Sequence, residues 1–226
     1  MSVIESARRL HVLVVSVTGG EPLMDPGLFS ILAGLRDAGL ATHLCTNGTL
    51  LSDDVVEALS ATSVRSVSVS LDSHDAATHN YLRNADCFDT TVKNIRRLRS
   101  RRPDIKIALN TVVCRCNFRH LAGVVRLAGE LGADQVNVAP LHTNLQHRHK
   151  PPAAFDDLAV PAHELAELDT CLKSAQAAAR RNNVRLSSRA YVDGIVRSYR
   201  EPRHWHVCYA GYATCAVNAW GDVSPC

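Results

Sequence analysis

The chain has 226 residues, of which 46% are hydrophobic and 21% charged, so it can bury one core and a small appendage. Its formal charge of +3 is too weak to indicate nucleic acid as a partner. Eight cysteines in a chain of this size do not resemble a secreted disulfide scaffold, and no apolar run is long enough to span a membrane. These features predict a cytoplasmic protein that acts on neither nucleic acid nor membranes.

Strand-like and helix-like patterns alternate along the first 140 residues. Between the strand-like runs, apolar residues recur at helical spacing, as Leu28, Leu32 and Leu35 do. This alternation favours right-handed crossovers and a parallel α/β sheet that is either curled into a barrel or open. The predicted strands are Val12–Thr18, Ala41–Thr46, Val64–Leu71, Ile105–Val113 and Gln135–Pro140.

The composition changes after residue 140. Residues 141–160 are rich in His, Pro, Asn and Gln and are predicted to form a long loop. Pro161–Asn182 has the apolar spacing of a helix. Beyond Asn183, short β-like pieces, aromatics, glycines and cysteines indicate a second module. The predicted parts are therefore a barrel over 1–160, a connecting helix over 161–182 and a small module over 183–226.

The first predicted strand ends in a Gly-Gly-Glu-Pro turn. Gly19 and Gly20 can adopt positive φ and let a ligand approach the bare backbone, while Pro22 stiffens the exit. Glu21 is thereby placed at the carboxyl end of a strand. A single Gly-Gly turn is more often an ordinary connection between a strand and a helix, but the other predicted strands end in comparable polar groups.

The carboxyl ends of parallel strands meet at one edge of a sheet, so these groups are expected to lie together. Ligands of α/β folds bind at that edge. Glu21 and free carbonyls suit an ammonium group, and Ser70, Asp72 and Asn110 suit ribose hydroxyls. The residues that could flank a flat base are Val113, Val138 and Ala139. A dinucleotide fingerprint and a Walker lysine are both missing from the sequence, so the edge is not suited to a nucleotide di- or triphosphate.

Five motifs follow one another in fixed order: SVTGGEPLMDPGL, LCTNGTLLS, VSVSLDSHDAATHNYLR, LNTVV and VNVAPL. Together they resemble the radical S-adenosylmethionine (SAM) superfamily from its second strand to its sixth, over roughly Val12 to His142. The resemblance implies an incomplete parallel (β/α) barrel of the radical SAM type that lacks its first strand. It also implies a full-length form that cleaves SAM reductively and uses the 5′-deoxyadenosyl radical to modify a peptide or protein, with a reductant protein as partner.

The resemblance also implies roles for single residues. The motif of Gly19, Gly20, Glu21 and Pro22 would hold the amino group of SAM. Asn47, Ser70 and Asp72 would line the same cofactor, beside Asn110 and Val138. Arg83 matches a position where many peptide-modifying members carry an arginine. A carboxylate-binding role and an ordinary ion pair at a helix start both remain open for it.

The tail carries a second resemblance. Cys208-Tyr-Ala-Gly-Tyr-Ala-Thr-Cys215, followed by Gly221-Asp-Val-Ser-Pro-Cys226, is similar to the opening of the SPASM module of peptide and protein maturases. The resemblance implies an auxiliary [4Fe–4S] site, incomplete in this chain, with Cys208, Cys215 and Cys226 as ligands. Zinc would need similar thiolates and is the alternative metal, while buried structural cysteines are a weaker alternative.

The chain departs from the family pattern in one respect. The Cys-x3-Cys-x2-Cys run that holds the catalytic cluster is missing from the printed sequence, and Cys114-x-Cys116 is in the wrong place for it. Both ends therefore look truncated, which indicates a gene fragment or a mis-assigned start. Three hypotheses follow: part of a radical SAM enzyme, a non-catalytic relative that binds a peptide or a partner enzyme, and an α/β domain with zinc in its tail.

Overall fold

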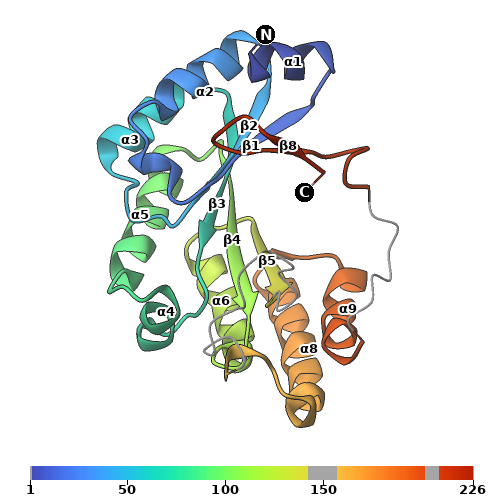
Figure 1. Ribbon diagram of the computed structural model, residues 1–226. Helices are drawn as coiled ribbons and strands as arrows, with labels where there is room; N and C mark the ends of the chain where they lie inside the picture. Colours follow the sequence, from blue (N-terminus) through green and yellow to red (C-terminus); the bar gives the residue numbers. More distant parts are fainter. Residues whose placement is uncertain (1, 142–156, 202–208, 226) are drawn as a thin grey trace.

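The computed structural model describes residues 2–141, 157–201 and 209–225 (Figure 1). Within these residues, six strands form one parallel sheet in the order of the sequence. This sheet confirms the predicted parallel α/β class and the partial barrel. The strands are β1 (Val14–Val17), β2 (Ala41–Thr46), β3 (Val64–Ser70), β4 (Lys106–Val113), β5 (Gln135–Pro140) and β6 (Arg185–Leu186).

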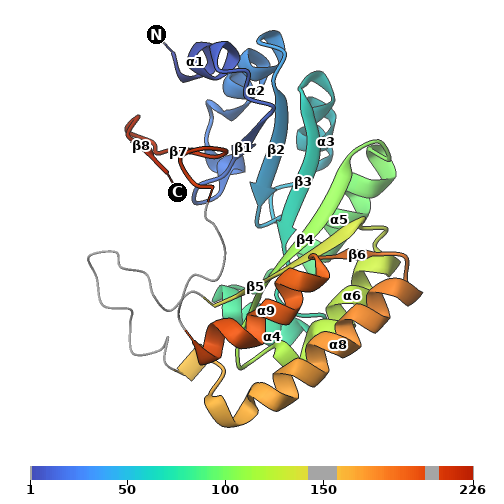
Figure 2. The ribbon, with the colours of Figure 1, turned by 90° about the vertical axis from the view of Figure 1, so that its right-hand side faces the viewer.

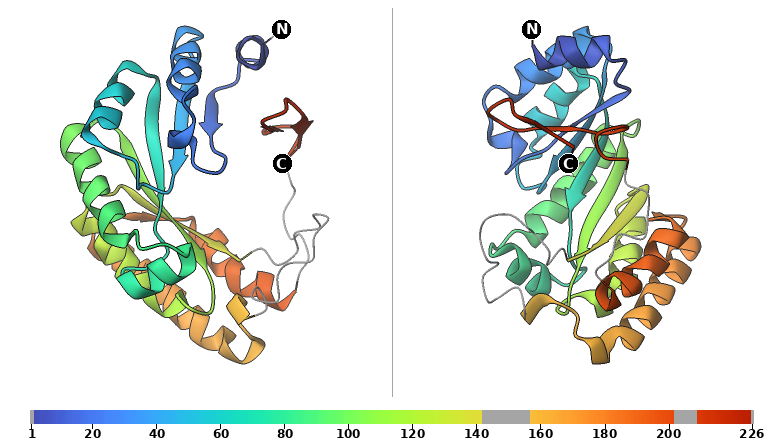
Figure 3. Two further views of the ribbon diagram at one scale, coloured as in Figure 1. Left: turned by 60° about the vertical axis from the view of Figure 1, so that its left-hand side comes forward. Right: turned by 45° about the vertical axis from the view of Figure 1, so that its right-hand side comes forward.

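The helices cover the outer, convex side of the curved sheet (Figures 2 and 3). Among the described residues, none of them combines the length and the apolar character needed to cross a membrane. The α-helices of the described part are α1 (Val3–Arg9), α2 (Leu28–Asp37), α3 (Asp53–Ala58), α4 (Ala76–Arg83), α5 (Phe88–Arg101), α6 (Leu121–Glu130), α8 (Leu165–Arg181) and α9 (Arg189–Arg200). Short 3-10 turns are formed by Pro22–Met24, Leu59–Ala61, Phe118–His120 and Ala162–Glu164.

The strands alternate between apolar and polar side chains. Successive residues of a strand point to opposite faces, so one face of β3 carries Val67 and Val69 and the other carries its serines. Leu44 of β2 and Leu109 of β4 are fully buried in the same core as these valines. The sequence thereby directs an apolar face to the helices and leaves a polar face on the concave side.

The sixth strand changes the predicted division of the chain. Arg185 and Leu186 pair in parallel with Gln135 and Val136 of β5. The apolar face of α9, which includes Ile195, is buried in the common core. Residues 183–200 thus extend the sheet and the core of the partial barrel, whereas the sequence had indicated that a separate module begins there. Two residues are too short a run to show a strand pattern, which explains the difference.

A small hairpin follows in the tail. It consists of β7 (Ala216–Val217) and β8 (Val223–Ser224), which pair antiparallel. Asn218 accepts the backbone N–H groups of Trp220 and Asp222 through its side-chain oxygen, and this closes the turn. The hairpin is the part of the predicted cysteine-rich module that the structure describes.

We expect Leu109→Ala to lower the free energy of unfolding by about 2–5 kcal/mol, because it removes a fully buried side chain from the middle of β4. Val112→Ala on the same strand is the matched control, since Val112 is 42% exposed, and it should cost less than about 1 kcal/mol. Urea unfolding followed by circular dichroism measures both values. Equal losses for the two variants would contradict the described orientation of β4.

Candidate functional site

The carboxyl ends of the parallel strands meet at one edge of the sheet, which we refer to as the carboxyl edge (Figure 1). Ser70 of β3, Asn110 of β4 and Asn137 of β5 are direct register partners across three adjacent strands. Leu71, the residue after Ser70, donates its N–H to the carbonyl of Asn110 at 2.9 Å. The structure therefore brings the predicted Ser70 and Asn110 together.

The carboxylate of Glu21 ties the turn after β1 to the end of β2. Its Oε2 accepts the backbone N–H of Asn47 at 2.6 Å, and its Oε1 accepts the hydroxyl of Thr46 at 2.7 Å. Oε1 also accepts the N–H of Leu23 at 3.2 Å. Three protein donors thus bind this half-buried carboxylate, and its predicted contact with an ammonium group stays a prediction. Its structural effect is to fix the position of the Gly19–Gly20 turn.

The backbone of the two glycines of that turn is not covered by any side chain of the described residues. Gly19 has a φ of +151°, which side-chain-bearing residues rarely adopt, and a Cβ built on either glycine would meet no atom within 4 Å. Within the described residues, no hydrogen bond uses the backbone of Gly19 or Gly20. The carbonyls and N–H groups of the turn are therefore free to bind a ligand at the carboxyl edge.

Asp72 is buried beside this edge and has partners within the protein. It is only 5% exposed; its Oδ1 accepts the N–H of Val112 at 3.0 Å, and its Oδ2 lies 2.6 Å from Nη2 of Arg83. The Asp72 N–H also donates to Nδ1 of His79 in α4. The carboxylate thus fixes the loop after β3, and its predicted contact with ribose hydroxyls stays a prediction. Burial makes such internal partners necessary for a carboxylate.

Arg83 forms an ion pair in the structure, which is one of the two roles that the sequence left open. It is the last residue of α4, so its ion pair with Asp72 lies at a helix end and not at a helix start. A cation is favourable there, because the carboxyl end of a helix carries partial negative charge. Its Nε is buried and has no hydrogen-bond partner among the described residues. The guanidinium is thus directed into the protein.

The side chains of Asn47 and Val138 have partners within the protein. The Oδ1 of Asn47 accepts the N–H and the hydroxyl of Thr49, at 2.8 and 2.7 Å, so it shapes the turn after β2. Val138 is 2% exposed, and its side chain packs in the hydrophobic core. Its N–H donates to Oγ of Ser187 at 3.0 Å. A contact between Val138 and a base would therefore be made by its backbone.

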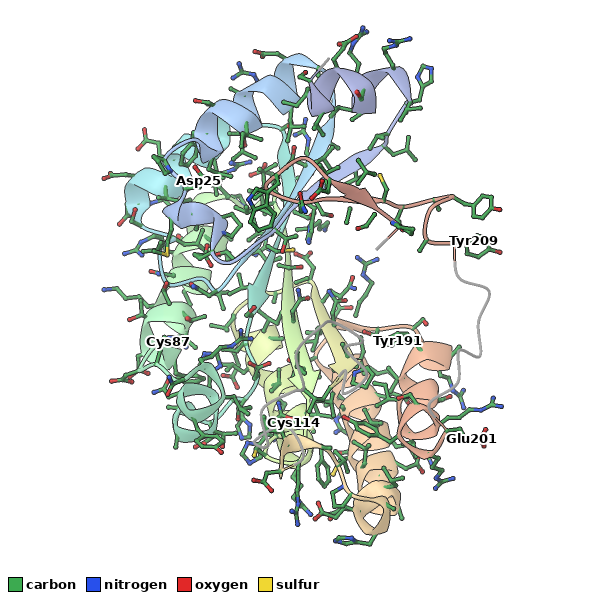
Figure 4. All side chains as sticks on the ribbon, viewed as in Figure 1. Asp25, Cys87, Cys114, Tyr191, Glu201 and Tyr209 are labelled. Carbon is green, nitrogen blue, oxygen red and sulfur yellow. The ribbon has the colours of Figure 1, made fainter. Side chains whose placement is uncertain are left out.

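A cavity of about 530 Å³ lies beside β4 and β5 and the start of α9. Tyr191, at the start of α9, is one of the lining residues (Figure 4). Partial burial raises the pKa of its phenol. All of the lining side chains are uncharged, so the cavity suits a ligand held by hydrogen bonds and apolar contact. It is lined by Asn110, Thr111, Gln135, Asn137, Val138, Ala139, Ser187, Ser188 and Tyr191.

Sequence reasoning had identified only Asn110, Val138 and Ala139 among these residues. Gln135 and Asn137 are polar residues at alternate positions of an otherwise apolar strand, which is a signal for a polar inner face. Ser187, Ser188 and Tyr191 were missed because they belong to the end of β6 and the start of α9. Their place in the site depends on a two-residue strand that has no sequence pattern.

The cysteines of the described chain do not form a metal site. Among the described residues, no group of three or more His, Cys, Asp or Glu side chains is arranged to hold a metal ion. Cys114 is buried just after β4 and Cys116 is exposed, as expected for packing and surface thiols. Cys215 is exposed beside the tail hairpin. Cys208 and Cys226 lie outside the described residues, so the predicted ligand set stays a prediction.

We expect Asp72→Asn to lower the free energy of unfolding by about 1–3 kcal/mol, because the new amide cannot pair with Arg83. Asp89→Asn, on the exposed first turn of α5, should cost less than about 1 kcal/mol. Denaturant unfolding measures both. A stability equal to that of the unaltered protein would show that the Asp72 carboxylate does not hold this loop.

The two neighbouring thiols should differ in reactivity. Burial raises the pKa of the Cys114 thiol to about 11, so at pH 8.5 it is almost entirely protonated and unreactive. Iodoacetamide should therefore modify the exposed Cys116 roughly a hundredfold faster in the folded protein, as followed by peptide mass spectrometry. In denaturant the two rates should converge. Similar rates in the folded protein would contradict the described burial.

Comparison with known proteins adds sequence relatives. The family model of the radical SAM superfamily matches residues 2–128. The AdoMet-dependent heme synthase of Methanosarcina barkeri is 30% identical over 220 residues, which cover 94% of this chain and 62% of that protein. The PqqA peptide cyclase of Xanthomonas campestris pv. campestris is 28% identical over 241 aligned positions, which cover 100% of this chain and 57% of the relative. The chain thus spans about three fifths of the length of these relatives.

Solved structures share the fold. SuiB of Streptococcus suis superposes with a TM-score of 0.75 at 18% identity, over 99% of this chain and 52% of SuiB. The structure of SuiB bound to S-adenosylmethionine superposes with a TM-score of 0.73, also at 18% identity, over 99% of this chain and 51% of that chain. Identities this low establish the shared architecture alone.

Proposed function

The chain belongs to the radical SAM superfamily, and we propose that it carries the SAM-binding part of an enzyme that modifies a peptide or protein. The observation that supports this most directly is the bare Gly19–Gly20 turn. The turn is fixed by Glu21 at the carboxyl edge, and the neutral polar cavity lies beside β4 and β5 of the same sheet. An exposed backbone suits the charged amino-acid end of SAM, and an uncharged cavity suits its nucleoside end.

Each group at the edge then has a defined task. The free carbonyls of Gly19 and Gly20 accept hydrogen bonds from the SAM ammonium, and Glu21 together with Pro22 keeps the turn in place. Ser70 and Asn110 lie on the row that faces the ribose hydroxyls. In a form that also carried the catalytic [4Fe–4S] cluster, one electron from a reductant protein would break the bond between the SAM sulfur and C5′, giving methionine and a 5′-deoxyadenosyl radical.

Two of the similar proteins support a substrate class. One relative is a peptide cyclase, and SuiB has been solved with a precursor peptide, SuiA. We therefore propose a peptide or protein substrate for the form of this protein that also carries the catalytic cluster, acting in the cytoplasm. We further propose that Cys208, Cys215 and Cys226 contribute to an auxiliary [4Fe–4S] site. Iron and sulfide analysis of reconstituted protein would separate this site from a zinc site.

Gly20→Ala tests the SAM site. The added methyl group meets no protein atom within 4 Å, so the free energy of unfolding should stay within about 0.5 kcal/mol of the original value. The methyl group would, however, occupy the space where SAM approaches the backbone. We expect the Kd for SAM, measured by isothermal titration calorimetry, to rise at least about tenfold, the equivalent of one charge-assisted hydrogen bond.

Gly194→Ala is the matched control for this experiment. Gly194 lies within α9, and a Cβ built there also meets no atom within 4 Å. This variant should bind SAM as the unaltered chain does and should unfold at slightly higher denaturant, because Ala favours a helix. If Gly20→Ala binds SAM as tightly as Gly194→Ala does, the turn is not the SAM site.

A further inference from the structure

Three amide side chains form a continuous row on the concave face of β4 and β5. Asn137 donates from Nδ2 to Oδ1 of Asn110 at 2.8 Å, across two strands in direct register. Gln135 donates from Nε2 to Oδ1 of Asn137 on the same strand. Residues two apart in a strand share a face, so all three side chains line the 530 Å³ cavity.

The row has a direction. In each amide the oxygen only accepts and the nitrogen only donates, so each contact orients the next amide. Asn110 uses its oxygen on Asn137, which leaves its Nδ2 as the group available to a ligand. At the opposite end, Oε1 of Gln135 is available as an acceptor. Within the described part of the chain, no hydrogen bond uses Nδ2 of Asn110 or Oε1 of Gln135.

We propose that Asn137, itself held by Gln135, is a positioning residue that fixes the Asn110 amide so that Asn110 meets bound SAM as a hydrogen-bond donor. This inference rests on the proposed function, which supplies the ligand. The atoms of SAM that can accept this hydrogen bond are the ribose oxygens and the adenine ring nitrogens. Ser70, the register partner of Asn110 on its other side, cannot set the orientation, because a hydroxyl both donates and accepts.

Without Asn137, the Asn110 amide could rotate by 180° at little cost. With Asn137 in place, the rotated amide would lose its hydrogen bond and would set two N–H donors against each other. The row therefore keeps the donor of Asn110 directed at the ligand before SAM arrives. Such preorganisation spares the ordering cost that binding would otherwise include.

Asn137→Asp is the first test. A carboxylate accepts only, so it would draw Nδ2 of Asn110 to itself and turn Oδ1 towards the ligand. We expect the Kd for SAM at pH 7.5 to rise about tenfold. Asn110→Asp keeps the acceptor for Asn137 but has no donor, so it should weaken binding to a similar extent. The double variant Asn110→Ala with Asn137→Asp should bind no worse than Asn110→Ala alone, because the two residues act through one hydrogen bond.

The control carries the same new charge at a different place. Asn183 is exposed, precedes β6 and does not line the cavity, so Asn183→Asp should bind SAM as the unaltered chain does.

A pH series adds a readout that a merely structural role would not change. When the carboxyl group introduced by Asn137→Asp is protonated, it regains an O–H that can donate to Asn110. The affinity of this variant should therefore recover towards that of the unaltered chain as the pH falls to about 4.

Side-chain amide NMR of the unaltered chain tests the row without SAM. The Nδ2 protons of Asn137 should exchange slowly with solvent, and those of Asn110 should exchange fast. The inference is overturned if this order is reversed, or if folded Asn137→Asp binds SAM as tightly as the unaltered chain. Should no variant, nor the unaltered chain, bind SAM at millimolar concentration, the proposed function fails, and the exchange rates alone decide whether the row exists.

Discussion

The candidate site depends on one interaction, the contact of the Glu21 carboxylate with the end of β2. β1 is an edge strand that pairs only with β2 among the described strands, so the turn that follows it has little else to hold it. Glu21 connects this turn to Thr46 and to the backbone of Asn47 by short hydrogen bonds. Charge-assisted bonds to a carboxylate are among the stronger ones in proteins, and they keep the bare glycines in place beside the neighbouring strand ends.

The fold and the site use the same alternation of side chains. Along β3, valines fill the core under the helices while serines occupy the concave face, and β4 and β5 continue this with Asn110, Gln135 and Asn137. A parallel strand buried on both faces is normally apolar throughout. Polar residues at every second position therefore indicate an inner face that meets solvent or a ligand. The cavity among these strands agrees with that interpretation.

This alternation also explains how much could be predicted. The strands, their parallel order and the shared edge of Ser70 and Asn110 follow from local patterns, and the structure bears them out. The internal partners of Glu21 and Asp72 could not be predicted, because they depend on loops that meet only after folding. β6 escaped notice because a two-residue strand is defined by its pairing with β5 and not by its own sequence.

The charged and the neutral side chains at the carboxyl edge differ in how easily they exchange hydrogen-bond partners. A carboxylate that is withdrawn from water needs donors. The half-buried Glu21 is bound by the backbone N–H of Asn47, and the buried Asp72 is bound by the N–H of Val112 and by Arg83, so neither changes partners at low cost. Amides and hydroxyls lose less when water leaves them, and they can exchange that water for a ligand. For this reason the charged residues fix the loops, while the neutral row of Asn110 and Asn137 is the part of the site that we propose recognises a nucleoside.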